Sequence, residues 1–321
     1  MTMMTTGTKS AMTPDVSVVV VSWNVRDLLQ RCLTSVEAAR ADGLSIETIV
    51  VDNASHDGSA ALVADDFPDA LLIANTDNRG FSRGCNQGIT AAGGRTVLLL
   101  NPDAALGTGS LRAMLDRLDQ RPDLGAVGPQ LRNEDGTVQS SRRRFPTLPT
   151  LFLMSTFIEY KFPGLSPFQQ LYANDRPDTD EQDVDWLVGA CLLLRRATLQ
   201  QVGGLDEQFF MYFEEMDWFR RAADAGWQTA YVPAAVAVHT GGRSSAQNLP
   251  LRHIRFNASR LRYARKHFGA AAATALRAWL LVAYGVQSGE EALKLAVGHR
   301  PEQRRQELGV YLSVLRSGLR P

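Results

Sequence analysis

The sequence predicts an α/β fold in which a mostly parallel central sheet is flanked by helices and followed by a helical tail. Three apolar runs of strand length, at 16–21, 46–51 and 97–100, show little polar alternation. Strands that are covered on both faces of a sheet have this composition. Apolar residues at helical spacing over 26–40 separate the first two runs. The order strand, helix, strand indicates parallel strands joined by helices.

The chain has 321 residues, of which 45% are hydrophobic, so it can bury the core of one large domain or two modest ones. Its formal net charge is zero, but residues 241–321 contain 14 Lys/Arg and 4 Asp/Glu. The sequence therefore combines an acidic body with a basic tail. Such a tail favours an anionic partner, such as phospholipid headgroups or a phosphorylated substrate; a solvated helical face is the alternative.

Cysteine usage and hydropathy bear on the cellular compartment. The three cysteines lie far apart without CxxC spacing, so neither a disulfide framework nor a zinc site is expected, and a reducing cytoplasm fits. Residues 1–14 lack an apolar core and are expected to form a flexible leader. The apolar stretch 278–286 is well short of the ~20 residues that span a bilayer, so an integral membrane protein is not expected.

The run 97–100 ends at Asn101, Pro102 and Asp103. Proline cannot donate to the sheet, so the strand stops at Asn101 and Asp103 follows its carboxyl end, where open α/β sheets bind ligands. A carboxylate there suits a hard divalent cation that holds phosphate oxygens. A plain turn is the alternative.

Two further loops follow strand ends. Asp52 directly follows the run 46–51, so we expect its side chain to project into the same crevice as Asp103, whereas Asp57 fits better as a cap of a helix over 59–66. After a strand over 70–74, the segment 75–88 places three glycines among basic and amide residues before a helix. This segment suits a phosphate cradle in which Arg83 supplies charge, or else a structural turn. Its spacing disfavours a Rossmann dinucleotide site.

The second half of the chain is predicted to be mixed in structure. The expected elements are a helix over 111–118, a strand over 125–128, a hairpin turn over 133–137, an irregular aromatic region over 145–172, a strand over 186–194, a helix over 197–202 and β-leaning stretches at 228–232 and 234–238. The aromatic region is expected to form part of an acceptor-binding surface or to be an ordinary packed insertion.

Five successive aromatic or Met residues, 209–213, are expected to bury the approach to a helix that opens with acidic residues. The positive end of the helix dipole stabilises the charges of Glu214, Glu215 and Asp217, so Glu214 or Glu215 is a candidate general base. Enrichment of acids in a first helical turn explains the same pattern. His239 precedes a glycine turn and is either structural or a metal ligand beside Asp103.

Three helices are predicted in the tail, at 251–268, 270–295 and 301–315. The first is basic and amphipathic. Together they suit docking on a membrane surface, while packing on the catalytic body explains the apolar stripe equally.

Over about 16–245 these segments, in order, resemble glycosyltransferase family 2, the inverting GT-A enzymes, and within it the rhamnosyltransferase-like members. Residues 18–24 resemble the family's first strand, with Trp23 in place of tyrosine. Residues 50–59 are similar to its base-binding segment, which implies that Asp52 hydrogen-bonds the pyrimidine. The segments 78–81 and 86–88 resemble its diphosphate-side loop.

The resemblance also assigns catalytic roles. Residues 101–103 stand at the DXD motif, of which only Asp103 is kept as the metal-binding acid. His239 stands in the His-x-Gly-Gly-x-Ser position and is a second metal ligand. Glu214-Glu215-x-Asp217 is similar to the Glu-Asp-x-Asp motif, which implies that Glu215 is the base, with Glu214 as the alternative.

The resemblance implies a GT-A catalytic domain over 15–245, with a nucleotide-sugar half at 15–128 and an acceptor half at 129–245, and a tail at 246–321. The implied cofactor is one divalent metal, Mg²⁺ or Mn²⁺. The residues implied to bind the nucleotide-sugar are Ser22, Asn24, Asp52, Asn53, Gly80, Arg83, Asn86, Asn101 and Asp103.

The implied activity is inverting transfer of a sugar, foremost L-rhamnose from dTDP-rhamnose, to a lipid-linked or polysaccharide acceptor in cell-envelope glycan synthesis. A UDP-galactofuranose or UDP-hexose donor, a soluble acceptor and a non-catalytic sugar-nucleotide-binding module are the alternatives. The expected partners are a nucleotide-diphospho-sugar, a glycan or glycolipid and an anionic membrane surface on the cytoplasmic face of the plasma membrane. Nucleic acid is not expected, and a homodimer is compatible with the sequence.

Overall fold

The computed structural model describes residues 13–241 and 248–320, so the predicted leader lies almost wholly outside the described residues. The strands are β1 (Val16–Ser22), β2 (Ile46–Asp52), β3 (Leu71–Ala74), β4 (Thr96–Leu100), β5 (Ala104–Leu106), β6 (Leu124–Arg132), β7 (Val138–Gln139), β8 (Arg142–Arg143), β9 (Gln182–Val184), β10 (Trp186–Leu187), β11 (Cys191–Arg195) and β12 (Gln228–His239). The helices are α1 (Arg26–Ala39), η1 (Arg40–Asp42), α2 (Ser59–Asp66), α3 (Phe81–Ala91), α4 (Ser110–Gln120), α5 (Leu148–Leu153), α6 (Phe157–Lys161), α7 (Ser166–Leu171), α8 (Arg196–Val202), α9 (Glu214–Asp224), α11 (Leu249–Phe268), α12 (Ala270–Ala296) and α13 (Pro301–Ser317).

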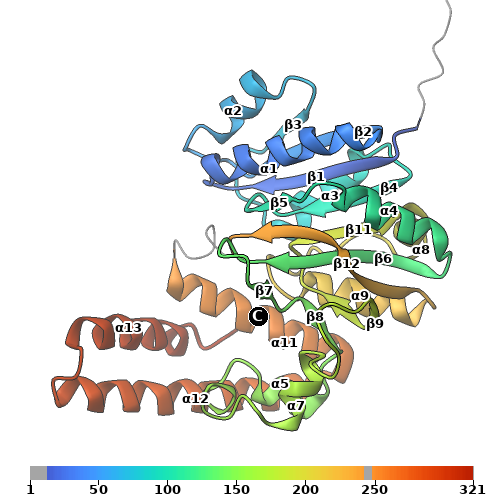
Figure 1. The fold of residues 1–321 in the computed structure, drawn as a ribbon. Helices are drawn as coiled ribbons and strands as arrows, with labels where there is room; N and C mark the ends of the chain where they lie inside the picture. The colour runs from blue at the N-terminus through green and yellow to red at the C-terminus, as the bar shows by residue number, and fades with distance from the viewer. Residues whose placement is uncertain (1–12, 242–247, 321) are drawn as a thin grey trace, which may run out of the picture.

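One large sheet organises the described chain, with helices on both of its faces (Figure 1). Its strand order is β3-β2-β1-β4-β11-β6-β12-β5, with β7 paired to β6 and β9 to β12. The four strands β3, β2, β1 and β4 run parallel, as the apolar runs predicted. In this register Ser22 lies beside Asp52, so the polar residues at the strand ends meet at one edge of the sheet.

Each face of the sheet has its own hydrophobic core. Along β1, Val18 and Val20 enter the core beneath α1, α2 and α4, whereas Val19 and Val21 enter the core beneath α3, α8 and α9. A Cβ on Gly88 of α3 would lie 2.2 Å from Val19 Cγ1, so only glycine lets α3 pack this closely on β1. Packing therefore explains this glycine of the predicted phosphate cradle.

Three predicted segments differ from the structure. The strand predicted over 186–194 is interrupted, because the Ala190 N–H donates to the Val188 carbonyl at 2.8 Å in a tight bend between β10 and β11. The two stretches on either side of Pro233 form the single strand β12, and a register shift between Val232 and Val236 accommodates the proline. The aromatic region 145–172 folds into the short helices α5, α6 and α7.

The three tail helices form as predicted, but several basic side chains of α11 bind groups of the body of the protein. Arg260 is fully buried and donates to the Leu151 carbonyl. Lys266 Nζ lies 2.6 Å from Asp206 Oδ2 and 2.8 Å from Asp217 Oδ1. These contacts hold α11 against the body, while α12 forms the lower edge of the molecule in Figure 1. Within 13–241 and 248–320, no helix has the length and apolarity needed to cross a membrane.

Candidate active site

A cavity of about 380 Å³ lies at the carboxyl ends of β1 and β4. The bend at Val188–Ala190, the residues before α9 and the first turns of α11 complete its walls. The cavity brings together seven residues predicted from the sequence, which are Ser22, Asn53, Asn101, Asp103, Glu214, Glu215 and His239.

Asp103 and His239 meet because β5 pairs antiparallel with the end of β12. The Asp103 carbonyl accepts from Thr240 N at 3.0 Å, and His239 Nε2 lies 3.3 Å from Asp103 Oδ1 without forming a hydrogen bond. His239 Nδ1 lies 2.7 Å from Gln139 Oε1. The amide nitrogen of Gln139 donates to Asn133 Oδ1 at 3.1 Å, which turns its oxygen toward the histidine.

This arrangement fixes the histidine tautomer. Because Gln139 Oε1 only accepts, Nδ1 carries the proton and the lone pair of Nε2 faces the Asp103 carboxylate. Two electron-rich groups this close repel each other unless a cation lies between them. An imidazole oriented by a carbonyl oxygen and placed beside a carboxylate is a usual half-shell for a divalent metal.

The pair fits a metal site that substrate completes. Among the described residues, no group of three or more His, Cys, Asp or Glu side chains is arranged to hold a metal ion. Asp103 and His239 would thus supply two ligands, and substrate oxygens and water the others. A divalent ion held there supplies charge neutralisation for a leaving diphosphate. The rest of the His-x-Gly-Gly-x-Ser motif, 242–244, lies outside the described residues.

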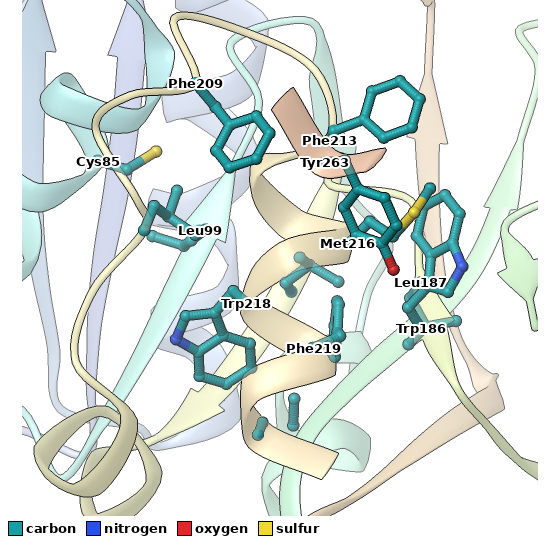
Figure 2. Packing of buried hydrophobic residues seen from close by; sticks show 14 of the residues in the cluster. Cys85, Leu99, Trp186, Leu187, Phe209, Phe213, Met216, Trp218, Phe219 and Tyr263 are labelled. Atoms are coloured by element: carbon teal, nitrogen blue, oxygen red, sulfur yellow. The ribbon is translucent and has the colours of Figure 1, made fainter. Parts of the chain in front are cut away.

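Glu214 and Glu215 are held at the cavity by a strained entry to α9. Tyr212 and Phe213 have φ values of +70° and +65°, a left-handed conformation that costs about 1–2 kcal/mol for each residue. Aromatic packing compensates: the ring of Phe213 lies 5.2 Å from that of Phe256. Figure 2 shows Trp186, Met216 and Tyr263 on one side of α9, with Cys85, Leu99 and Trp218 on the other. Packing of the aromatic residues before and within α9 therefore holds Glu214 and Glu215 in place at the cavity.

The environment raises the pKa of both acids. Burial and then the charge of Glu215 raise the pKa of Glu214 well above its ordinary value. Burial also raises the pKa of Glu215, but its own backbone, the Gly189 and Met216 backbone and the charge of Arg143 oppose that effect. Glu215 is therefore the better stabilised carboxylate of the pair.

Asp217 lies outside the cavity wall. Its fully buried carboxylate accepts from Arg221 Nε at 2.9 Å and contacts Lys266 and His267 on α11. Burial opposes ionisation, but these hydrogen bonds lower the pKa of Asp217 to about 2. The third acid of the motif thus joins α9 to α11 and does not face the cavity.

Three of the residues predicted to bind the nucleotide-sugar, Asp52, Asn24 and Asn53, lie at the carboxyl ends of β1 and β2. Asp52 is 2% exposed, and its Oδ2 accepts from Ser55 N at 2.9 Å, while its Oδ1 has no partner among the described residues. Asn24 accepts from His56 N at 2.8 Å and so joins the loops after β1 and β2. Asn53 donates to the Gly80 carbonyl at 3.1 Å and lines the cavity.

Gly80, Arg83 and Asn86 are engaged by the body. Gly80 has φ +87°, and a Cβ there would lie 2.6 Å from the Phe210 carbonyl oxygen. Because α3 begins at Phe81, Arg83 and Asn86 lie on a helix rather than in a loop: Arg83 Nε lies 3.0 Å from Glu207 Oε2, and Asn86 Nδ2 donates to the Leu205 carbonyl at 2.8 Å. None of the three lines the cavity.

Sequence reasoning missed several residues of the site, of which Gln139 orients His239 without lining the cavity. Gln139 carries no local signal, because its role depends on the pairing of β6 with β7. Arg252 and Arg255 line the cavity, whereas the pattern of α11 predicted docking on a membrane surface or packing on the body, without a place for these arginines at the site. Tyr212 also lines it, in a segment predicted only as apolar cover.

Buried polar atoms without partners converge on this cavity. In the part of the chain that the structure describes, the cavity-lining atoms of this kind are Ser22 Oγ, Asn101 Oδ1, Tyr212 Oη, Glu214 Oε2, Glu215 Oε2 and His239 Nε2. Buried polar groups in folded proteins are nearly always hydrogen-bonded, so such a cluster indicates a site that a polar ligand completes.

Comparison with known proteins gives a consistent result. The model of glycosyl transferase family 2 matches residues 17–203. The chain is 33% identical over 257 residues to an N-acetylglucosaminyl-diphospho-decaprenol L-rhamnosyltransferase of Mycobacterium tuberculosis, over 75% of this chain and 82% of that protein. It is 28% identical over 144 residues to the rhamnosyltransferase WbbL of Escherichia coli, over 44% of this chain and 51% of that protein.

Two solved structures share the fold. One is the mannosyltransferase PcManGT of Pyrobaculum calidifontis in complex with GDP-Man and Mn²⁺, with a TM-score of 0.54 and 17% identity over 96% of this chain and 88% of that chain. The other is GalNAc-T7 with UDP, GalNAc and Mn²⁺, with a TM-score of 0.54 and 14% identity over 70% of this chain and 43% of that chain.

Proposed function

The chain is a glycosyltransferase of family 2 with a GT-A fold, and from this premise we propose that it transfers L-rhamnose from dTDP-rhamnose to a lipid-linked acceptor in cell-envelope glycan synthesis. The observation that carries the proposal is the group of buried, unpartnered polar atoms that surround the acid pair in the cavity. A polyhydroxylated sugar and a diphosphate supply the hydrogen-bonding groups that these atoms lack.

The proposed donor is a pyrimidine nucleotide. Asp52 Oδ1 is buried without a partner at the end of β2, which suits hydrogen bonding to a ring N–H of thymine or uracil. Asp52 alone does not discriminate between these bases. The choice of dTDP-rhamnose rests on the two relatives whose names specify rhamnosyl transfer.

The proposed base is Glu215, with Glu214 held mainly neutral beside it. A base must be ionised to accept the proton of the acceptor hydroxyl, and Glu215 is the better stabilised carboxylate. Its raised pKa brings its basicity closer to neutral pH, where a general base works best. Removal of the proton as the hydroxyl attacks the anomeric carbon, opposite the leaving diphosphate, gives single displacement with inversion. Asp103 and His239 would hold the divalent ion on the diphosphate side.

The proposed acceptor is a prenyl diphosphate lipid carrying a sugar, as the name of the Mycobacterium tuberculosis relative specifies for that protein. A prenyl acceptor resides in a bilayer, so the enzyme must approach the membrane. That contact suits the exposed apolar residues on and next to α12 and α6 better than it suits α11. They are Val282, Val286 and Leu293 of α12, Val297 directly after it, Tyr160 of α6 and Phe162 directly after it.

Calorimetric titration of the purified chain tests the donor. We expect dTDP to bind more tightly than UDP, more tightly with Mg²⁺ or Mn²⁺ than without, and more weakly to Asp52→Ala. Preference for UDP would replace rhamnose as the proposed sugar. Binding without any transfer would instead support a sugar-nucleotide-binding module.

A further inference from the structure

The first turns of α11 place two arginines at the cavity. Arg252 and Arg255 are the two Lys or Arg side chains among the described residues that line it. The other charged groups of the lining are Asp103, Glu214 and Glu215, with His239 as the only histidine. A diphosphate brought into this cavity would meet the carboxylates of Asp103 and Glu215, so cationic groups are required to bind it.

These two arginines differ from Arg260 and Lys266 on the same helix. Arg260 and Lys266 are satisfied by a carbonyl and by two carboxylates of the body. By contrast, neither Arg252 nor Arg255 has an ion-pair partner within the described ranges. Arg252 is exposed, whereas Arg255 is half-buried, and a half-buried guanidinium without a counter-ion carries a cost that an anionic ligand relieves.

Arg255 is also pre-oriented. Its guanidinium lies 3.9 Å from the ring centroid of Phe210, a stacked cation–π contact that restrains the side chain. A stacked guanidinium keeps its N–H edge available for bidentate bonding to phosphate oxygens.

The hydroxyl of Tyr212 supplies a third group. It lines the same cavity and is buried without a partner among the described residues. Tyr212 is close enough to Arg255 to act on its charge, and its ring lies 5.5 Å from that of Phe256 on the same helix. A phenol donates one hydrogen bond, which a phosphate oxygen accepts.

We propose that Arg252, Arg255 and the Tyr212 hydroxyl form a diphosphate-binding subsite on the α11 wall of the cavity. This inference rests on the proposed function, because both substrates of that reaction carry a diphosphate, the donor next to its nucleoside and the acceptor next to its prenyl chain. The subsite explains why the tail helix is part of the catalytic unit and why its first cations are left unpaired.

The test uses the full chain with Arg252→Gln, Arg255→Gln and Arg255→Lys. Arg265→Gln is the matched control, because Arg265 is exposed on the same helix and does not line the cavity. Titration with dTDP and with thymidine, in Mg²⁺, isolates the phosphate contribution to donor binding. The KM for a prenyl-diphospho-N-acetylglucosamine acceptor, at saturating dTDP-rhamnose, reports on the acceptor.

Because a charge-assisted contact is lost, we expect Arg255→Gln to raise either the Kd for dTDP or the KM for the acceptor roughly 10- to 100-fold. Arg255→Lys should retain part of the wild-type affinity, and Arg265→Gln should change neither quantity. Weaker dTDP binding with unchanged thymidine binding assigns the subsite to the donor. A raised acceptor KM with unchanged dTDP binding assigns it to the acceptor. If the wild-type chain transfers rhamnose and both quantities are unchanged in Arg252→Gln and Arg255→Gln, the subsite is wrong while the proposed function stands. If the wild-type chain transfers no sugar, the proposed function fails, and the subsite fails with it.

Discussion

His239 Nε2 lies 3.3 Å from Asp103 Oδ1, although 135 residues separate them in the sequence. The antiparallel pairing of β5 with β12 creates this contact, and Gln139 turns the unprotonated nitrogen of the ring toward the carboxylate. The pair has the chemistry of a metal half-shell, and its behaviour can be tested through the residue that orients it.

Gln139→Leu should weaken metal binding without removing a proposed ligand. Loss of the Nδ1 hydrogen bond frees the ring to rotate and to change tautomer, and such outer-sphere changes cost roughly 10- to 100-fold in metal affinity. The measurement is the Mn²⁺ concentration that gives half-maximal dTDP binding. Gln306→Leu, at an exposed position of α13, is the control. An unchanged half-maximal concentration in Gln139→Leu would show that the orientation of His239 does not matter for the metal.

Glu215→Gln should abolish transfer while dTDP binding stays within about twofold, because the amide cannot accept the acceptor proton. Glu214→Gln should retain part of the activity, since Glu214 is the more strongly neutralised acid. Initial rates and calorimetry of the two variants check this. Complete loss in Glu214→Gln together with activity in Glu215→Gln would reverse the assignment.

The pH dependence of kcat/KM follows from the raised pKa of Glu215. The base works only when ionised, so kcat/KM should rise with pH through a pKa above the usual glutamate value of about 4.3. A rate profile that is flat from pH 5 to pH 8 would argue against a buried carboxylic acid as the base.

The raised pKa of Glu214 also makes a prediction about stability. A carboxyl with a higher pKa in the folded state contributes stability below its unfolded pKa and loses it as the pH rises through the folded pKa. Glu214→Gln removes that loss. The free energy of unfolding of the variant, compared with that of the wild type, should therefore be more favourable at pH 8 than at pH 5. Urea unfolding at both pH values measures this. If the free energies of unfolding of the variant and the wild type differ by the same amount at pH 5 and pH 8, the pKa of Glu214 is not raised in the folded protein.

Asp217→Asn should destabilise the protein by about 2–4 kcal/mol, because it leaves Arg221 and Lys266 without their buried counter-ion. The depressed pKa of Asp217, about 2, means that its stabilisation is present above the unfolded value and is lost as the pH falls toward 2. Urea unfolding at pH 7 checks the loss. Folded Asp217→Asn should still bind dTDP, and a specific loss of catalysis in the folded variant would assign this acid a role in the reaction.

Val286→Glu with Leu293→Glu should reduce co-flotation with anionic lipid vesicles, since charges on the exposed face of α12 oppose burial in the interface. Arg265→Gln is expected to have a smaller effect. Wild-type protein that does not float, or a double variant that floats equally well, would remove the membrane role of this face.

The sequence was most informative where one residue type dictates local structure. Apolar branched runs predicted the parallel strands, and the aromatic run before Glu214 predicted a buried entry to α9. It was least informative where a role depends on distant pairing. Gln139 reaches His239 only through the pairing of β7 with β6, and Arg255 and the bend at Gly189 line the cavity only once α11 and β11 have packed. No local period in the sequence reports that packing.

Close packing also accounts for part of the segment that was predicted as a phosphate cradle. The glycines, Arg83 and Asn86 have the composition of a phosphate loop, yet Gly88 lets α3 approach β1, and Asn86 holds the segment around Leu205. Small and amide residues serve close packing and phosphate binding equally well, so composition alone does not separate the two uses.

The central claim is that this chain moves rhamnose to a lipid-linked sugar with Glu215 as the base. The most direct measurement is the transfer of labelled rhamnose from dTDP-rhamnose to prenyl-diphospho-N-acetylglucosamine, with Mg²⁺, by the wild-type chain and by Glu215→Gln. We predict labelled lipid product from the wild-type chain and none above background from Glu215→Gln, although that variant still binds dTDP. Equal product from both proteins, or none from the wild-type chain that binds dTDP, would contradict the account.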